Sequence, residues 1–134
     1  MSTNNAIGFS VDIPLTFDQA DQRVRELLKV EGFGVLTEID VRATMREKLD
    51  VDFPRYEILG ACNPQLAHRA LQAEPSSGLL LPCNVVVTER GQSGSQVSFM
   101  DPVAILALVD NPALEAIAAD AAERLRRVAA ALEG

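Results

Sequence analysis

Aromatic residues are scarce in this sequence and tryptophan is absent, which limits the side chains that can fill a core. Aromatic residues make up 4% of the 134 residues, whereas hydrophobic residues together make up 48%. We therefore expect a core of leucine, valine, isoleucine and alanine. Charged residues contribute 23%, so both fractions are close to the globular average and argue against disorder. The length fits a single domain over residues 1–134.

Positive charge is also scarce. The net charge is −7 and the sequence pI is about 4.6. Arg124, Arg126 and Arg127 are scattered among acidic residues and form no basic stripe. A protein that binds nucleic acid needs clustered basic side chains to neutralise phosphates, so we expect no nucleic-acid partner. The same acidity argues against docking on anionic membranes.

Long hydrophobic segments are missing as well. The longest apolar run, residues 78–87, is interrupted by Pro82 and Asn84 and is too short to cross a bilayer. Residues 1–5 are polar and lack the basic and apolar regions of a secretory signal. We therefore expect a cytoplasmic protein without membrane partners, in which the two cysteines stay reduced.

The sequence contains a mixture of strand and helix patterns. Apolar alternation predicts strands over residues 7–13, 33–39, 56–62, 79–90 and 96–100. The strand over 79–90 is expected in two pieces, because Pro82 cannot donate to a central ladder. Helical spacing and cap residues predict helices that follow Thr16, Asp40, Asn63, Asp101 and Asn111. The helices do not strictly alternate with the strands, which favours an α+β fold with a mainly antiparallel sheet of about five strands and helices packed on one face. The other face then needs a cover, most simply a second copy of the chain, so we expect a homodimer.

Short cap and turn signals predict where individual elements begin and end. Thr16 and the glutamine three residues later have the reciprocal pattern of a capping box. Asn63 precedes Pro64, and asparagine is a strong helix cap while proline suits the first helical position. Gly32 predicts the end of the first helix. Gly60, inside a predicted strand, indicates a bulge or a close backbone approach.

The two cysteines are the centre of functional interest, and each is followed by asparagine. Cys62 lies where the strand over 56–62 ends and a helix begins. Because the N-terminus of a helix favours an anion, we expect the Cys62 thiol to ionise more easily than a free one. If the strands that carry them are neighbours, Cys83 lies within a few ångströms of Cys62.

Several segments resemble the domain-of-unknown-function family 302. The resemblance is carried by residues 31–40, 58–64 and 80–87, and Asp101-Pro102 also fits. It spans most of the chain, from about Val11 to the last helix. It implies a compact α+β fold similar to the TATA-binding-protein-like class, and a dimer. The family has no established activity, and the likeness of fold carries no DNA-binding function.

Three interpretations of Cys62 and Cys83 stay open. They are small apolar fillers of a packed sheet, or Cys62 is a nucleophile that Cys83 resolves, or both bind a metal ion. A structural zinc site needs four ligands, and His68, the one histidine, is predicted to face solvent. A two-thiolate site for a soft monovalent ion is compatible with the two residues.

The asparagines differ in what their positions predict. Asn63 is interpreted as a helix cap. Asn84 stands inside a strand, where its amide needs partners, so it either pins the loop around Cys62 or faces a ligand. The other polar candidates are interpreted as a turn cap, an edge residue and a solvated helix face: Asp101, Glu89, Arg42 and Arg46.

The favoured hypothesis is a small-ligand or soft-metal binding or sensing module. Its site lies around Cys62, Asn63, Cys83 and Asn84, and it requires both sulfurs to share one accessible cavity. The alternatives are a thiol-dependent enzyme with Cys62 as nucleophile, and a structural homodimeric domain with inert cysteines. No cofactor is identified, and no Ser-His-Asp, Cys-His or Cys-x-x-Cys arrangement decides whether a reaction is catalysed.

Overall fold

The structure, a computed structural model, describes residues 2–134 and contains one antiparallel sheet of six strands. The strand order is β1-β2-β6-β5-β4-β3. The strands are β1 (Ser2–Asn4), β2 (Gly8–Ile13), β3 (Gly34–Asp40), β4 (Tyr56–Cys62), β5 (Cys83–Arg90) and β6 (Gly94–Met100). The predicted α+β class and antiparallel sheet are confirmed. The sixth strand is β1, whose short polar sequence has no apolar alternation to reveal it.

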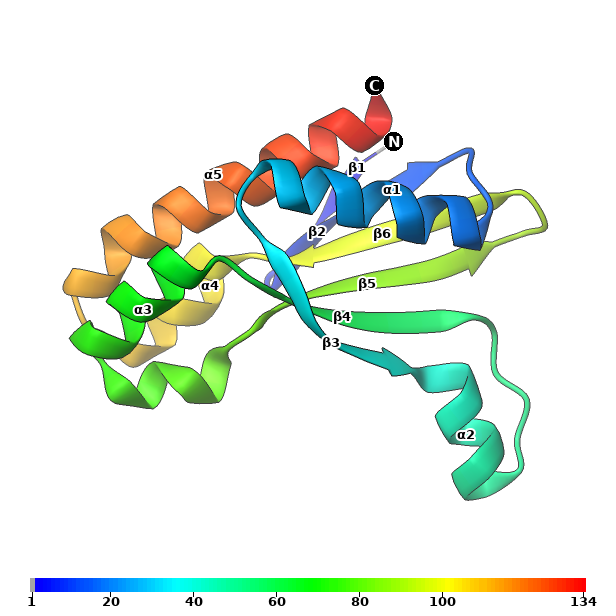
Figure 1. The fold of residues 1–134 in the computed structure, drawn as a ribbon, viewed down its shortest axis with the longest axis horizontal. Helices are drawn as coiled ribbons and strands as arrows, with labels where there is room; N and C mark the ends of the chain where they lie inside the picture. The colour runs from blue at the N-terminus through cyan, green and yellow to red at the C-terminus, as the bar shows by residue number, and fades with distance from the viewer. Residues whose placement is uncertain (1) are drawn as a thin grey trace.

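The two longest helices cover one face of the sheet (Figure 1). These are α1 (Phe17–Val30) and α5 (Ala113–Glu133), and both pack on strands of the sheet and on each other. Alternate residues of β2, β5 and β6 point to these helices and are fully buried. The core is mostly aliphatic, and its largest members include Phe99, Leu28, Leu59, Leu114, Leu125, Val85 and Val97.

Cap residues set the ends of α1 as the sequence predicts. The side chain of Thr16 accepts a hydrogen bond from the backbone N–H of Gln19, whose side chain accepts one from the N–H of Thr16. At the other end Gly32 has a φ of 85°, a left-handed conformation that favours glycine. The chain therefore turns sharply, and Phe33 enters the core.

Shorter helical elements gather at one end of the sheet (Figure 1). They are α3 (Pro64–Ala73), the 3₁₀ helix η1 (Pro75–Leu80), α4 (Pro102–Leu106) and the 3₁₀ turn η2 (Ala107–Val109). The prediction of a strand from residue 79 is wrong for its first four residues, because η1 extends to Leu80 and β5 begins only at Cys83. Pro82 has no N–H to donate to a strand ladder, so pairing begins after it.

The segment from β3 to α2 (Val41–Leu49) is loosely packed. Neither element contains a buried residue, and α2 projects away from the sheet (Figure 1). Asp40 caps α2 as predicted, since its side chain accepts a hydrogen bond from the N–H of Ala43. The predicted apolar stripe of this helix, Val41, Met45 and Leu49, exists in the sequence but covers no core.

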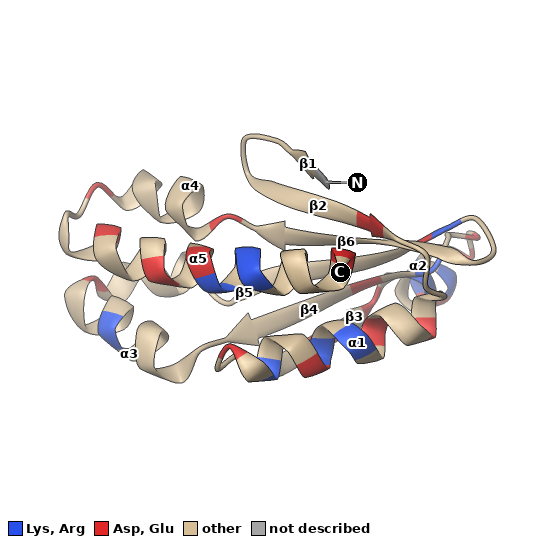
Figure 2. Ribbon diagram, turned by 90° about the horizontal axis from the view of Figure 1, so that it is seen from above, with Lys and Arg blue, Asp and Glu red and all other residues tan. Residues whose placement is uncertain are grey.

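The sheet face opposite α1 and α5 carries a mixture of polar and apolar side chains, among them Val86 and Met100. Ser10 and Ser98 lie on this face, and their hydroxyl oxygens are 2.7 Å apart. On the covered side, the outer surfaces of α1 and α5 carry interleaved acidic and basic residues (Figure 2). Neighbouring turns pair them, as in Arg25 with Asp21 at 2.9 Å. Among the described residues no helix is long and apolar enough to cross a bilayer.

Candidate functional site

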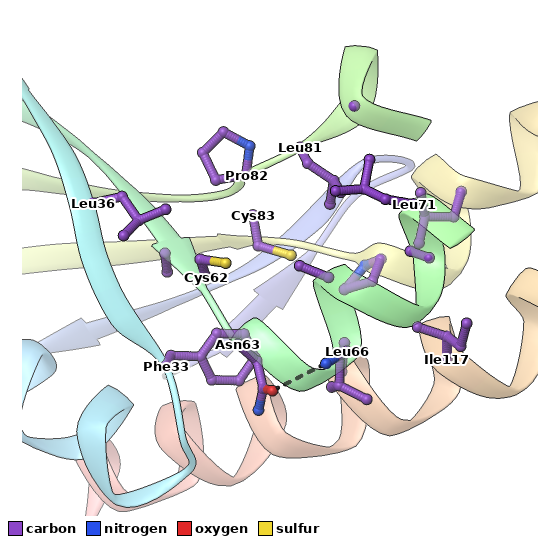
Figure 3. Close-up of a pocket in the computed structure, with 17 residues that line it drawn as sticks. Phe33, Leu36, Cys62, Asn63, Leu66, Leu71, Leu81, Pro82, Cys83 and Ile117 are labelled. Atoms are coloured by element: carbon purple, nitrogen blue, oxygen red, sulfur yellow. Dashed lines mark hydrogen bonds between the residues drawn. The ribbon is translucent and has the colours of Figure 1, made fainter. Parts of the chain in front are cut away.

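An apolar cavity lies at the end of the sheet where β4 and β5 meet α3, η1, α4 and α5 (Figure 3). Its volume is about 210 Å³. Aliphatic and aromatic side chains form most of its walls, among them Phe33, Leu36, Leu66, Leu71, Leu81, Pro82, Leu106 and Ile117. Both cysteines and Asn63 also line it. The cavity reaches the surface, since its lining residues Leu36 and Leu71 are 68% and 42% exposed.

The pairing of β4 with β5 brings the two cysteines together. Cys83 lies opposite Ala61, and both side chains face the helices. Cys62 is the next residue and would point to the opposite face in a regular strand. It is the last residue of β4, however, and the chain then turns into α3. Both sulfur atoms point into the cavity (Figure 3), so the requirement that they share one accessible space is met.

Both thiols are free. Burial raises the pKa of the Cys62 thiol. Burial, and secondly the nearby Cys62, raise the pKa of Cys83 to about 11. The expectation that Cys62 ionises easily is therefore wrong. Its apolar surroundings disfavour the thiolate, and the helix end that was expected to stabilise it is capped by Asn63 instead.

Asn63 joins the start of α3 to the end of α1. Its Oδ1 accepts a hydrogen bond of 3.2 Å from the N–H of Leu66, and its Nδ2 donates one of 3.4 Å to the carbonyl of Glu31. Arg124 donates to the same carbonyl at 3.0 Å. Asn63 is only 8% exposed. The predicted role as a helix cap is confirmed, and both polar ends of the side chain are held by the protein.

Asn84 lies away from the cavity. In the regular ladder of β5 its side chain points opposite to that of Cys83, and it is exposed on the uncovered face of the sheet. There it borders a shallow depression that also includes Tyr56 and Ser98. The four residues of the two Cys-Asn dipeptides therefore do not form one site. The structure brings together Cys62, Asn63 and Cys83 and leaves Asn84 outside.

Comparison with known proteins agrees with the resemblance seen in the sequence. A family model described as "Domain of unknown function DUF302" matches residues 9–132. The chain belongs to the DUF302 family. Its structure is similar to the crystal structure of an uncharacterized conserved DUF302 protein from Bacillus stearothermophilus, with 33% identity and a TM-score of 0.87. The match covers 95% of this chain and 98% of that one. No curated protein matches the sequence, and neither finding indicates a specific function.

Metal ligands are few around the cavity of this DUF302 domain. Within residues 2–134, no group of three or more histidine, cysteine, aspartate or glutamate side chains is placed to hold a metal ion. His68 is exposed on the outer side of α3, as predicted. Cys62 and Cys83 would be the protein ligands of any ion in the cavity, and both would first have to lose a proton.

Several walls of the DUF302 cavity were not identified from the sequence, because they come from distant segments. Pro102, Ile117 and Ala121 belong to α4 and α5. One signal does exist, which is the use of alanine where a larger side chain would fill the core. Ala67 and Ala70 on α3 and Ala121 on α5 all line the space. Small residues on facing stripes leave volume that a ligand can occupy.

Gly60 lies against Pro82, which is part of the wall of the DUF302 cavity. A Cβ at this position would collide with the side chain of Thr37 and lie 2.8 Å from Cγ of Pro82. Glycine therefore allows β3 and the segment before β5 to approach β4 from two sides. This packing positions Leu36 and Pro82 at the cavity.

A group of charged side chains lies at the opposite end of β4. Arg25 contacts Glu38 at 2.6 Å and Glu57 at 3.1 Å, and it also pairs with Asp21. Burial is the main cause that raises the pKa of Glu57 to about 7, and the neighbouring Asp21 carboxyl raises it further. One oxygen of Glu57 is buried without a hydrogen-bond partner. This group ties α1 to β3 and β4 and does not border the thiol-lined cavity.

Proposed function

We propose that this DUF302 domain is a binding module for a small, uncharged, apolar molecule that occupies the cavity beside Cys62 and Cys83. The observation that carries the proposal is the cavity of about 210 Å³, which has apolar walls and includes the exposed side chains of Leu36 and Leu71. The walls of an apolar cavity offer water few hydrogen-bond partners, so an apolar guest binds there more favourably than water does.

The volume sets the size of the ligand. An engineered cavity of about 150 Å³ with aliphatic walls holds benzene. By proportion, a cavity of about 210 Å³ suits a guest of roughly eight non-hydrogen atoms. A charged guest would lose its hydration without gaining an ionic partner, because no charged side chain of residues 2–134 lines the space.

The surroundings of the thiols favour binding over thiol catalysis. A nucleophilic cysteine needs a lowered pKa or an adjacent base. Here burial raises the pKa of both thiols. Within the described chain, the cavity wall contains no histidine, aspartate or glutamate that could take a proton from Cys62.

Binding of toluene tests this proposal. NMR titration of the wild-type protein should show saturable shifts in residues around the cavity, with a Kd of roughly 10–1000 μM, whereas benzoate should produce none. Ala67→Leu places three extra carbons inside the space and should abolish the shifts. Ala73→Leu is the matched control, because Ala73 lies on the same helix with similar exposure and outside the cavity.

Two results would contradict the proposal. One is the absence of saturable toluene binding to the wild type. The other is equal binding to the wild type and to folded Ala67→Leu, which would place the site elsewhere.

A soft monovalent metal ion such as Cu(I) is the second candidate ligand. The specific observation is that two sulfurs point into one cavity, which suits the two-thiolate coordination that such ions accept. Anaerobic competition with a colorimetric Cu(I) chelator should then give one ion per chain. Single replacements Cys62→Ala and Cys83→Ala should each abolish retention. Retention by either variant would exclude a site made of the two thiolates.

We also propose that the functional form is a cytoplasmic homodimer in which a second copy covers the open face of the sheet. The central part of this face carries uncharged side chains, such as Ser10, Val86, Ser98 and Met100. Light scattering should show a dimer that Val86→Arg converts to a monomer. Val30→Arg, at an exposed position of α1 on the covered side, should remain dimeric. A monomeric wild type would contradict the proposal.

A further inference from the structure

We propose that Cys62 and Cys83 form a reversible intrachain disulfide by exchange with a low-molecular-weight disulfide such as oxidised glutathione, and that this bond locks the walls of the cavity. The bond itself does not depend on a ligand. The control of the cavity rests on the proposed binding function, and the two parts are tested by different measurements.

The strand register places the two residues within bonding reach. Cys83 lies opposite Ala61, so Cys62 is displaced by one residue along the neighbouring strand. With strands about 4.8 Å apart and a rise of about 3.3 Å per residue, the two Cα atoms lie roughly 6 Å apart. Disulfides form at Cα separations of about 4.4–6.8 Å.

The direction of the side chains removes the usual obstacle to such a pair. Diagonal neighbours in a regular ladder point to opposite faces of the sheet and cannot bond. Cys62 is at the end of β4, and its sulfur points to the same cavity as that of Cys83 (Figure 3). The Cys62 thiol also contributes to the raised pKa of Cys83, as expected for two groups that lie close together.

Accessibility fixes the order of the two exchange steps. Cys62 is partly exposed and Cys83 is buried. Cys62 therefore meets the incoming disulfide first, and Cys83 can reach the sulfur of Cys62 from inside the cavity without contacting solvent. In this order Cys62 is the attacking residue and Cys83 the resolving one.

Both steps are balanced. The Cys62 thiolate attacks one sulfur of R–S–S–R, the S–S bond breaks, and R–S⁻ leaves and takes up the proton that Cys62 released. The Cys83 thiolate then attacks the sulfur of Cys62 in the mixed disulfide, and a second R–S⁻ leaves and takes up the proton of Cys83. The protein dithiol is oxidised by two electrons, and the small disulfide is reduced to two thiols.

The bond would act on the walls of the cavity because of the segment that it closes. Residues 63–82 lie between the two cysteines and contain α3 and η1, which line the space. A crosslink at the base of this loop restricts the movement by which α3 and η1 separate. We expect a ligand to enter and leave the oxidised form more slowly than the reduced form.

Intact mass spectrometry after incubation with oxidised glutathione tests the bond. The wild type should lose two hydrogen atoms and retain no glutathione. Cys83→Ala should retain one glutathione, because the mixed disulfide at Cys62 then has no resolving thiol. Cys62→Ala should remain unmodified. Reaction should accelerate about tenfold per pH unit between pH 7 and 9, since the thiolate is the attacking species.

Glutathione retained on the wild type, a disulfide between two chains, or no reaction at pH 9 would overturn the assignment. Toluene exchange measured by NMR on both forms tests the second part, with at least threefold slower exchange expected after oxidation. Equal exchange rates would overturn the control of the cavity and leave the bond in place. Absence of toluene binding to the reduced protein would instead overturn the proposed function, while the mass measurement still decides the disulfide.

Discussion

The two Cys-Asn dipeptides have the same residues and opposite environments. In the first, Cys62 is partly exposed and Asn63 is buried at 8% exposure. In the second, Cys83 is buried at 7% exposure and Asn84 is exposed. One dipeptide therefore contributes both side chains to the region of the cavity, and the other contributes only its sulfur.

The difference comes from where each dipeptide stands in its strand. Cys83 and Asn84 begin a regular ladder, in which neighbouring side chains alternate between the two faces. Cys62 ends β4, and Asn63 adopts the extended conformation that caps α3. Beyond the end of a strand, side chains no longer have to alternate between the two faces of the sheet, so consecutive side chains can lie on the same side. This arrangement allows a polar cap and a thiol to border the same apolar space.

The largest contrast is expected between the two asparagines. Asn63→Ala should lower the free energy of unfolding by about 3 kcal/mol, because it removes a helix cap and leaves the buried N–H of Leu66 unpaired. Asn84→Ala should change it by less than about 0.5 kcal/mol, as expected of an exposed side chain. Urea denaturation of both variants measures the contrast.

Asn63→Ser serves as the control for this contrast, because serine restores a side-chain acceptor for the start of α3. It should recover about 1 kcal/mol of the loss. Similar losses for Asn63→Ala and Asn84→Ala would show that the buried and exposed positions do not differ as the structure describes.

The next expected effect is a pH dependence of stability that comes from the buried thiol of Cys83. The folded pKa of Cys83 is raised from 9.0 to about 11, chiefly by burial. The folded state therefore binds more protons than the unfolded state between these values, and stability falls as the pH rises through them. The loss from pH 8 to pH 11 should be about 2–3 kcal/mol larger in the wild type than in Cys83→Ala.

Denaturation curves of the wild type and Cys83→Ala at pH 8, 9.5 and 11 measure this difference. The comparison cancels the titration of lysine and tyrosine, which both proteins share. Parallel loss of stability in the two proteins would show that the buried thiol does not hold its proton more tightly in the folded state.

Replacement by serine should separate the two cysteines more weakly. Cys83→Ser puts a hydroxyl group among apolar side chains, and it should lower the free energy of unfolding by about 1–2 kcal/mol. Cys62→Ser should cost about half as much, because its side chain reaches solvent through the opening of the cavity. The matched alanine variants show how much of each loss is due to the hydroxyl, and equal losses at both positions would contradict the difference in burial.

Local signals in the sequence predicted much of the fold. The capping box at Thr16, the left-handed Gly32 and the Asn63-Pro64 cap all depend on interactions within a few residues, and each is confirmed. Gly60 was expected to mark a bulge or a close backbone approach, and the structure instead places the side chains of Thr37 and Pro82 where its Cβ would lie.

The errors concern properties that depend on distant segments. The pKa of Cys62 was expected to fall because of the adjacent helix, but walls from α3, α5 and η1 bury the thiol and raise it. The segment 79–90 was expected to form a strand in two pieces divided at Pro82, but the residues before Pro82 belong to the end of η1 and its exit, and only the second piece is a strand. The direction of Asn84 was left open because no local signal states which face of β5 is covered.

A last contrast is expected in thiol reactivity, and it tests the order of the two sulfurs in the cavity. At pH 8, iodoacetamide should alkylate Cys62 at least tenfold faster than Cys83, since Cys62 is partly exposed and burial suppresses the thiolate of Cys83 more strongly. Both should react more slowly than the same residues in guanidinium, where the difference should disappear. Peptide mapping after timed quenching gives the two rates. If Cys62 instead reacts faster than an unfolded thiol at pH 7, its pKa is lowered rather than raised, and the case for a thiol-dependent enzyme regains its main support.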